Sequence, residues 1–337
     1  MKGGNKSMDI KQEVYIGLDT HRETIHGTAL NKEGEVICSC NFPANKEAIE
    51  EFMKSFTVWN THIAIEACNH WKFAYNILNE KGYEVMLANP AKCRQIAKDK
   101  KTDEVDSRII ADLRRINYLP KVTILSDKIL KLRDLCRHKS NLTRMRSKVQ
   151  TKIKSHLSRN GIPYEKNLWE KEKIAWLKSL NDLEIDSFLR VYDLLKNEEK
   201  LTKKQIVKTA MMNEDILLLK TIPGVGYYGA VMIYEEIGDI NRFKDPKNLH
   251  AYAGVVPGIY QSGSKSRTKT RSEVNYWLKW IVGQCAGSIF KKKSKLQKYY
   301  YKMKAKKGNK IARKATARKI LTISWHILKE KIPYQES

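Results

Sequence analysis

Long hydrophobic runs are missing from this sequence. No apolar stretch approaches the roughly 18 to 20 residues needed to span a bilayer, and the start, MKGGNKSMDIKQEVYIGLD, contains no apolar core of signal-peptide length. These absences argue against a membrane partner and predict a cytoplasmic protein. The six cysteines are scattered without a CxxC pair or a matching histidine spacing. The sequence therefore predicts neither structural zinc nor a disulfide framework, and we expect most of the cysteines to be buried thiols.

Acidic residues are few relative to basic ones. The chain has 37 Asp and Glu against 64 Lys and Arg, which gives a formal charge of +27. Such an excess predicts a polyanionic partner, and nucleic acid is favoured over membrane. The alternative is a generally basic protein without such a partner. Hydrophobic residues make up 42% of the 337 residues, so we expect two or three folded domains with real cores and not a basic tail.

The first region, residues 12–120, alternates strand-like and helical patterns, as is typical of an α/β domain. An antiparallel meander of three strands is predicted for the runs VYIGLD, TIHGTAL and EVICSCNF. THIAIEA and YEVMLAN predict two further strands. Helices are expected over residues 46–55, over WKFAYNILNEKG and over residues 103–116.

Two helical regions follow. The pattern over residues 126–212 is typical of long charged helices. Their apolar stripe has no obvious partner within the chain, and this favours a coiled-coil-like packing or dimerisation seam. Residues 214–330 predict a mainly helical domain. Its segment 264–319 contains 19 Lys and Arg and one acid, Glu273, and such a concentrated charge favours contact with phosphates. The stripe comprises Leu132, Leu135, Leu142, Met145, Val149, Ile153 and Leu157.

Four acids form the first candidate site. Asp19 and Glu66 each end an apolar strand, and Asp103 and Asp106 are spaced by three, which places both on one face of a helix. Each acid alone is equally typical of a helix cap or a solvated charge. Converging carboxylates repel one another unless a cation lies between them, and such oxygen ligands suit Mg²⁺ or Mn²⁺ flanking a phosphate. Together the four predict a metal site of the RNase H or resolvase type.

Two glycine-containing segments give candidate phosphate contacts. The run Ile222-Pro223-Gly224-Val225-Gly226 is similar to the hairpin of a helix-hairpin-helix motif, so Gly224 and Gly226 are candidate contacts to DNA phosphate; a simple turn is the alternative. Further cations for phosphate contact are Lys291, Lys292 and Lys293.

The second segment places Ser262 beside Gly263, ahead of a run of basic residues. A serine hydroxyl needs a base, a metal or strong positive potential to attack phosphorus. Without these, a Ser-Gly pair before basic residues is usually a phosphate-binding loop. The cations that follow the serine are Lys265, Arg267, Lys269 and Arg271.

In this order, the motifs resemble the DEDD-type insertion-sequence transposases, which join a resolvase-like N-terminal domain to a C-terminal transposase domain and include the pilin-gene invertases. The resemblance extends from about Tyr15 to Leu328. It implies that Asp19, Glu66, Asp103 and Asp106 bind the metal and that Ser262 is the nucleophile. It also implies DNA as substrate and, as in many members, a structured guide RNA encoded by the element. The motifs that carry the resemblance are YIGLDTHRE, IAIEA, NPAKCRQIAKDKKTDEVDSRIIADLRR, TIPGVG and AYAGVVPGIYQSG.

One departure from the family pattern follows the second acid. Members commonly have Ala-Thr-Gly there, whereas Ala67 is followed by Cys68, Asn69 and His70.

The leading hypothesis is a serine- and Mg²⁺-dependent transposase acting as a dimer or tetramer. The alternatives are a resolvase-like nuclease that uses water and a non-catalytic RNA-binding scaffold. Retention of all four acids argues against the scaffold.

Overall fold

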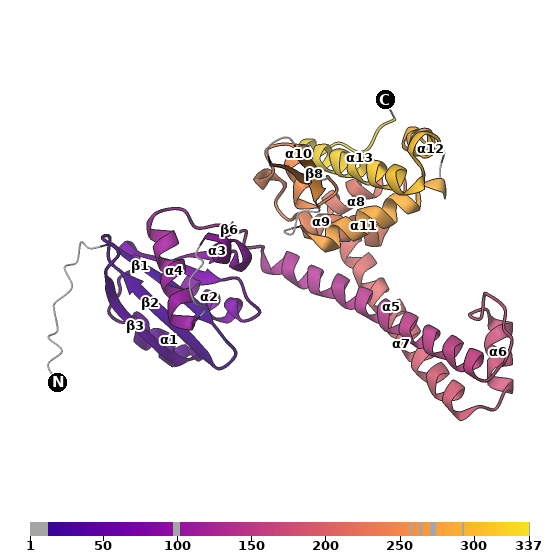
Figure 1. Cartoon of the computed structure of the whole chain (residues 1–337), viewed down its shortest axis with the longest axis horizontal. Helices are drawn as coiled ribbons and strands as arrows, with labels where there is room; N and C mark the ends of the chain where they lie inside the picture. Colours follow the sequence, from indigo (N-terminus) through magenta and orange to yellow (C-terminus); the bar gives the residue numbers. More distant parts are fainter. Residues whose placement is uncertain are drawn as a thin grey trace. The chain divides into compact units, whose positions relative to one another are not determined.

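The computed structural model describes residues 13–96, 102–256, 258–262, 265–269, 274–291 and 293–336, with only the backbone for 258–262, 265–269 and 291. The chain divides into two compact units, unit 1 ending at Ile124 and unit 2 beginning at Leu125 (Figure 1). Unit 1 is a mixed α/β sheet domain, and unit 2 is mostly helical. Within the described ranges, no helix is long and apolar enough to cross a membrane.

Unit 1 is built on one mixed sheet with the strand order β3-β2-β1-β4-β5-β6. The predicted meander is confirmed, because β1 (Val14–Thr20), β2 (Thr24–Leu30) and β3 (Val36–Pro43) pair antiparallel in turn. β4 (Thr61–Glu66) and β5 (Glu84–Ala88) then run parallel to β1. The sequence did not predict the short edge strand β6 (Lys121–Val122).

Helices cover both faces of this sheet. The predicted helices are present as α1 (Lys46–Met53), α2 (Trp71–Glu80) and α4 (Asp103–Arg115), and α3 (Pro90–Ile96) is additional; a 3₁₀ turn, Val58–Asn60, precedes β4. Alternate strand residues point to opposite faces. Ile16, Leu18, Ile63 and Ile65 therefore pack with α1 and α2, whereas Ala64 packs with α3 and α4.

The approach of α4 to the sheet depends on small residues. Gly17 has no side chain, and a Cβ there would lie 2.0 Å from the carbonyl oxygen of Ser107 in α4. The Ser107 hydroxyl forms hydrogen bonds of 2.7 Å with Thr28 Oγ1 and 3.0 Å with His26 Nδ1, both on β2. Helix α4 is thus held against β1 and β2, with its N-terminus capped by the Thr102 hydroxyl.

Unit 2 begins with a helical hairpin. α5 (Asp127–Arg159) and α7 (Leu183–Met211) pack side by side, and α6 (Lys171–Ser179) lies in the connection between them (Figure 1). Near α6 their apolar side chains, including Ile153, Leu157, Ile185 and Leu189, form a separate small core. The expectation that the α5 stripe lacks a partner within the chain is wrong, because α7 supplies one.

The main core of unit 2 lies among the later helices. It joins the opposite ends of α5 and α7 to α8 (Glu214–Lys220), α9 (Tyr227–Ile237), α10 (Pro246–Tyr252), α11 (Tyr276–Gly287), α12 (Lys295–Lys307) and α13 (Asn309–Glu330). Short 3₁₀ turns lie at Ile240–Arg242 and Ile289–Lys291. An antiparallel hairpin of β7 (Gly258–Ser262) and β8 (Lys265–Lys269) stands between α10 and α11.

Two adjacent glutamates are fully buried at the junction of α9 with α5. The Arg133 Nε donates to Glu235 Oε2 at 2.9 Å, and the Arg137 guanidinium binds Glu236 at 2.8 Å. The Asn275 side chain, which precedes α11, also donates to Glu236 at 2.8 Å. Buried carboxylates need such partners, because an unpaired buried charge is strongly destabilising. These contacts fasten α5 to the core of unit 2.

Candidate metal centre

The candidate metal ligands lie at the carboxyl ends of two neighbouring parallel strands. Asp19 is near the end of β1 and Glu66 ends β4, and the register pairs Leu18 with Ile65, so the two acids are adjacent. Each acid is two residues beyond a small residue, Gly17 or Ala64, on the face covered by α4. The strand pattern therefore directs both carboxylates towards the N-terminal turn of that helix.

Helix α4 supplies the other two acids, Asp103 and Asp106, in its first turn. The structure brings all four predicted acids together in two overlapping groups. Ligand atoms of Asp19, Glu66 and Asp106 lie within 4.8 Å of one another, and so do those of Asp19, His21 and Asp103. Asp19 belongs to both groups. Of the four acids, Asp19 is also the most enclosed, with 5% of its surface exposed.

The electrostatics of the cluster follow from crowding and burial. Burial raises the pKa of Asp19, and the nearby charges of Asp103 and Asp106 raise it further, against the opposing effect of His21. Burial also raises the pKa of Glu66, assisted by Asp19 and opposed by Arg94, whose guanidinium lies 3.6 Å from the Glu66 carboxylate. A cation at this position would offset both the burial and the mutual repulsion that raise these pKa values.

The donor set fits a divalent cation. Carboxylate oxygens from three different elements converge, and hard oxygen ligands of this kind are the ones that Mg²⁺ and Mn²⁺ take. Residues Asp19, Glu66 and Asp106 can hold one such ion without any nitrogen or sulfur ligand. Cys93 also lies nearby, but burial, with Glu66 and Asp106 beside it, raises the pKa of its thiol to about 11. The thiol form is a poor metal ligand.

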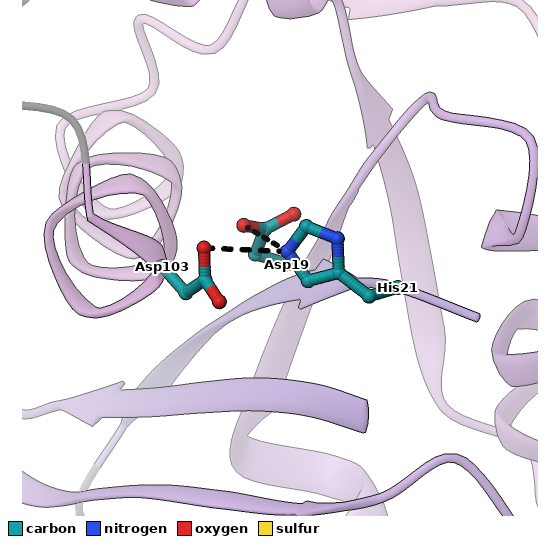
Figure 2. A group of neighbouring side chains, drawn as sticks. All are labelled: Asp19, His21 and Asp103. Carbon is teal, nitrogen blue, oxygen red and sulfur yellow. Dashed lines mark ion pairs between the residues drawn. The ribbon is translucent and has the colours of Figure 1, made fainter. Parts of the chain in front are cut away.

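His21 was not among the residues predicted from the sequence. Its Nε2 atom lies 3.3 Å from Asp19 Oδ2 and 3.3 Å from Asp103 Oδ1, as Figure 2 shows. The only local signal was its position two residues after Asp19, directly beyond the end of β1. Such a spacing places two side chains on one face, but a single histidine beside an acid is too common to identify a site.

The departure from the family pattern after Glu66 is also resolved in atomic terms. The Cys68 thiol donates to the backbone oxygen of Thr20 at 3.0 Å and lies 3.0 Å from the Thr20 hydroxyl. Cys68 thus joins the ends of β4 and β1 beside the acids. Glu66 remains in the cluster with Asp19 and Asp106 despite the changed residues.

Ser262 and the predicted phosphate-binding cations belong to unit 2. Ser262 ends β7 and pairs in register with Lys265, and Arg267 and Lys269 follow on β8. The side chains of Ser262, Lys265, Arg267, Lys269 and Lys291 lie outside the described residues, as do Arg271 and Lys292 altogether. Lys293 is exposed just before α12.

The run containing Gly224 and Gly226 forms the turn between α8 and α9. Gly224 has a φ of +85°, and a Cβ there would lie 2.7 Å from the carbonyl oxygen of Cys285 in α11. This glycine is therefore required for close packing within unit 2. Gly226 precedes α9, and a Cβ there would meet nothing within 4 Å. The identification of this turn as a helix-hairpin-helix motif stays a prediction.

Comparisons with known proteins match two parts of the chain to transposase families. Residues 16–161 match a DEDD transposase family of IS110 type, and residues 217–301 match the transposase IS116/IS110/IS902 family. The chain is 26% identical to the transposase for insertion sequence element IS1111A of Coxiella burnetii, over 81% of this chain and 79% of that one. It is 22% identical to the transposase for insertion sequence element IS1328 of Yersinia enterocolitica, over 81% and 83%.

A relative of a different kind is the pilin gene-inverting protein of Moraxella bovis, which is 25% identical over 96% of this chain and 98% of its own. The chain is thus an enzyme of the transposase and DNA-invertase class, which cleaves and rejoins DNA. It belongs to the IS110/IS116 family of transposases, and both family domains are present.

Proposed function

We propose that this transposase recombines DNA with a Mg²⁺-dependent site formed by Asp19, Glu66, Asp103 and Asp106 and with Ser262 as nucleophile. The observation that carries the proposal is the convergence of the Asp19, Glu66 and Asp106 carboxylates from β1, β4 and α4. Three acids from separate elements are brought together at considerable electrostatic cost, and cation binding is the chemistry that offsets it.

The sheet order supports a fold of the RNase H or resolvase type for unit 1. Three antiparallel strands are followed by two parallel ones, and a helix crosses the sheet to bring acids to the carboxyl ends of β1 and β4. A divalent cation bound there would polarise the scissile phosphate and stabilise the leaving oxygen. The residues of the chain would hold it: Asp19 and Glu66 from two neighbouring strands, and the α4 acids from the helix that covers them.

Ser262 would perform the covalent step. Its hydroxyl oxygen would form a bond to phosphorus while the bond from phosphorus to the leaving DNA oxygen breaks, which gives a protein–DNA phosphoester. The antiparallel pairing places the backbone of Ser262 next to Lys265, so the serine lies at the closed end of a strand pair rich in Lys and Arg. Positive charge around the serine favours the charged transition state.

DNA is the substrate implied by the family, and the charge distribution supports extensive phosphate contact. Within the basic segment 264–319, the lysines of α12, including Lys298, Lys302 and Lys306, are exposed, as is Lys293 before it. A structured guide RNA encoded by the element is the second proposed partner; it rests on the family resemblance, and the formal charge of +27 suits a polyanion of this kind. We also propose a dimer or tetramer as the active form.

The competing enzyme function is a nuclease that uses water and needs only the acids of unit 1. The two differ in whether a covalent protein–DNA adduct forms. We expect Ser262→Ala to eliminate both cleavage and the adduct on DNA carrying the element ends, and Ser266→Ala, a serine on β8 of the same hairpin, to retain them. If Ser262→Ala cleaves DNA at the wild-type rate, or if the adduct maps to another residue, the water-using nuclease is the better description.

A further inference from the structure

His21 lies next to the four acids of the cluster, Asp19, Glu66, Asp103 and Asp106. Figure 2 shows the carboxylates of Asp19 and Asp103 on the same side of its ring, with Nε2 directed at both. The three donor atoms lie within 4.8 Å of one another, as do those of Asp19, Glu66 and Asp106. Asp19 is common to the two groups. The cluster thus consists of two donor sets that share one buried carboxylate.

Local structure holds His21 in this position. Its backbone amide donates to the Thr24 carbonyl at 2.8 Å, which closes the turn between β1 and β2. It follows Asp19 by two residues, directly after the last residue of β1. On the other side, the hydroxyl of Thr102 caps α4 and fixes the first helical residue, Asp103. The ring is therefore placed by two anchored segments, although 49% of its side-chain surface is exposed.

The separations suit ligands of a single ion. Adjacent ligand atoms around an octahedral ion, bound at about 2.1 Å, stand about 3 Å apart. The distances of 3.3 Å from Nε2 to each carboxylate are close to that value. A neutral imidazole also adds no charge to a group that already contains four carboxylates, so it adds a ligand without adding repulsion.

We propose that His21 is a metal ligand, and that the site holds two ions that share Asp19. One position has only oxygen ligands, from Asp19, Glu66 and Asp106. The second has Asp19, Asp103 and the His21 nitrogen. This inference rests on the proposed cation-dependent function and adds a fifth ligand to it.

Unequal ligand sets have a chemical consequence. Carboxylates suit Mg²⁺ and Mn²⁺ alike, whereas an imidazole nitrogen is a better ligand for first-row transition ions than for Mg²⁺. The second position should therefore take Mn²⁺ in preference to Mg²⁺, and the first should accept either. The competing arrangement is a protonated His21 that pairs with Asp19 and Asp103 in place of a second cation, which leaves one ion per chain.

Mn²⁺ binding to the full-length protein tests the inference without measuring activity. Titration followed by the electron paramagnetic resonance of free Mn²⁺ should give two ions per wild-type chain and one for His21→Ala. Protein labelled with ¹⁵N-histidine should show a histidine nitrogen coupled to bound Mn²⁺, and His21→Ala should lose that coupling. His70→Gln, an exposed histidine that follows β4, is the matched control and should behave as wild type.

The outcomes separate this inference from the proposed function. A single Mn²⁺ per chain that depends on Asp106 but shows no coupling to histidine would overturn the role of His21 and leave the carboxylate site intact. Two ions retained by His21→Ala would overturn it equally. Failure of the wild-type protein to bind any Mn²⁺ would count against the proposed function itself. Thermal unfolding of each variant verifies that it is folded.

Discussion

Gly17 of β1 lies directly against the backbone of Ser107 in α4. A Cβ on Gly17 would be 2.0 Å from the Ser107 carbonyl oxygen and 2.6 Å from the Ala111 amide nitrogen. These atoms are helix backbone and have no rotamer to change. The distance between the strand and the helix, and with it the distance from Asp19 to Asp106, therefore depends on the absence of one methyl group.

Gly17→Ala should push α4 away from the sheet and weaken the metal centre. We expect a decrease of about 1–3 kcal/mol in the free energy of unfolding, as for other overpacked cores, and a lower affinity for Mn²⁺. Urea unfolding and Mn²⁺ titration measure the two effects. Gly283→Ala is the control, because a Cβ there would meet nothing within 4 Å. A folded Gly17→Ala protein with wild-type Mn²⁺ affinity would contradict the argument.

Asp106→Asn should abolish strand cleavage and leave DNA binding nearly intact. The substitution removes one charged ligand from the Asp19 and Glu66 group while keeping the size of the side chain. Cleavage of labelled element-end DNA and a binding assay give the two quantities. Glu104→Gln removes an exposed acid from the same helical turn and should cleave normally. Full activity of Asp106→Asn with Mg²⁺ would remove this acid from the mechanism.

The buried pair of glutamates in unit 2 predicts a pH-dependent stability. Burial, with Glu236 beside it and against the attraction of Arg133, raises the pKa of Glu235 to about 8. The folded chain then binds a proton that the unfolded chain releases above its ordinary pKa of 4.5. Stability contributed by this proton is present at low pH and decreases as the pH rises from about 4.5 to 8, by at most about 1.4 kcal/mol per pH unit.

Denaturant unfolding at a series of pH values measures this slope. Glu235→Gln should flatten it, because the amide does not titrate. Glu198→Gln, an exposed position on α7, should leave the slope unchanged. If Glu235→Gln and wild type lose stability in parallel over this range, then Glu235 is ionised throughout and its ion pair with Arg133 dominates over burial.

The basic segment should make DNA binding steeply dependent on salt, because each neutralised phosphate releases condensed counterions. Replacing Lys291, Lys292 and Lys293 by Gln should reduce the slope of log affinity against log salt by about 0.9 for each phosphate that is no longer neutralised. The same change at three exposed lysines of α7, Lys200, Lys203 and Lys204, is the control for net charge. Equal effects of the two triple variants would place the phosphate-binding cations elsewhere.

Local signals in the sequence were sufficient for strands β1 to β5 of the sheet and for the convergence of the four acids. Alternating apolar residues identified β1 and β4, and an acid at the end of each such strand pointed to one sheet edge, since parallel neighbours end together. A spacing of three placed Asp103 and Asp106 on one helical face. These patterns repeat over a few residues and depend little on the remainder of the chain.

Features that depend on distant residues were not predictable. The partner of the α5 stripe lies on α7, and Arg133 pairs with Glu235 across 102 residues of sequence. Likewise, the need for Gly17 appears only when α4 is packed on it, and His21 becomes notable only because Asp103, 82 residues further along the chain, also lies against its Nε2. In each case one half of the interaction has no distinctive local pattern.

We predict that the chain self-associates through α7. With the α5 stripe partly occupied by α7, a row of exposed apolar side chains remains on α7 itself: Val191 is 42% exposed, Leu194 61% and Leu201 57%. Their spacings of three and seven residues place them on one face, as the seam of paired helices requires. A second copy of the chain can bury this face against its own α7.

Sedimentation velocity of the full-length protein, with and without DNA, should show a dimer or larger assembly for wild type. Exchanging Leu194 and Leu201 together for Glu should shift it to monomer, because two charges would then be buried in the seam at a cost of several kcal/mol. Lys203→Glu alters an exposed charged position on the opposite side of α7 from Leu201 and should associate as wild type does. A wild-type protein that remains monomeric at high concentration both with and without DNA, or a double variant that still assembles, would exclude this face as the interface.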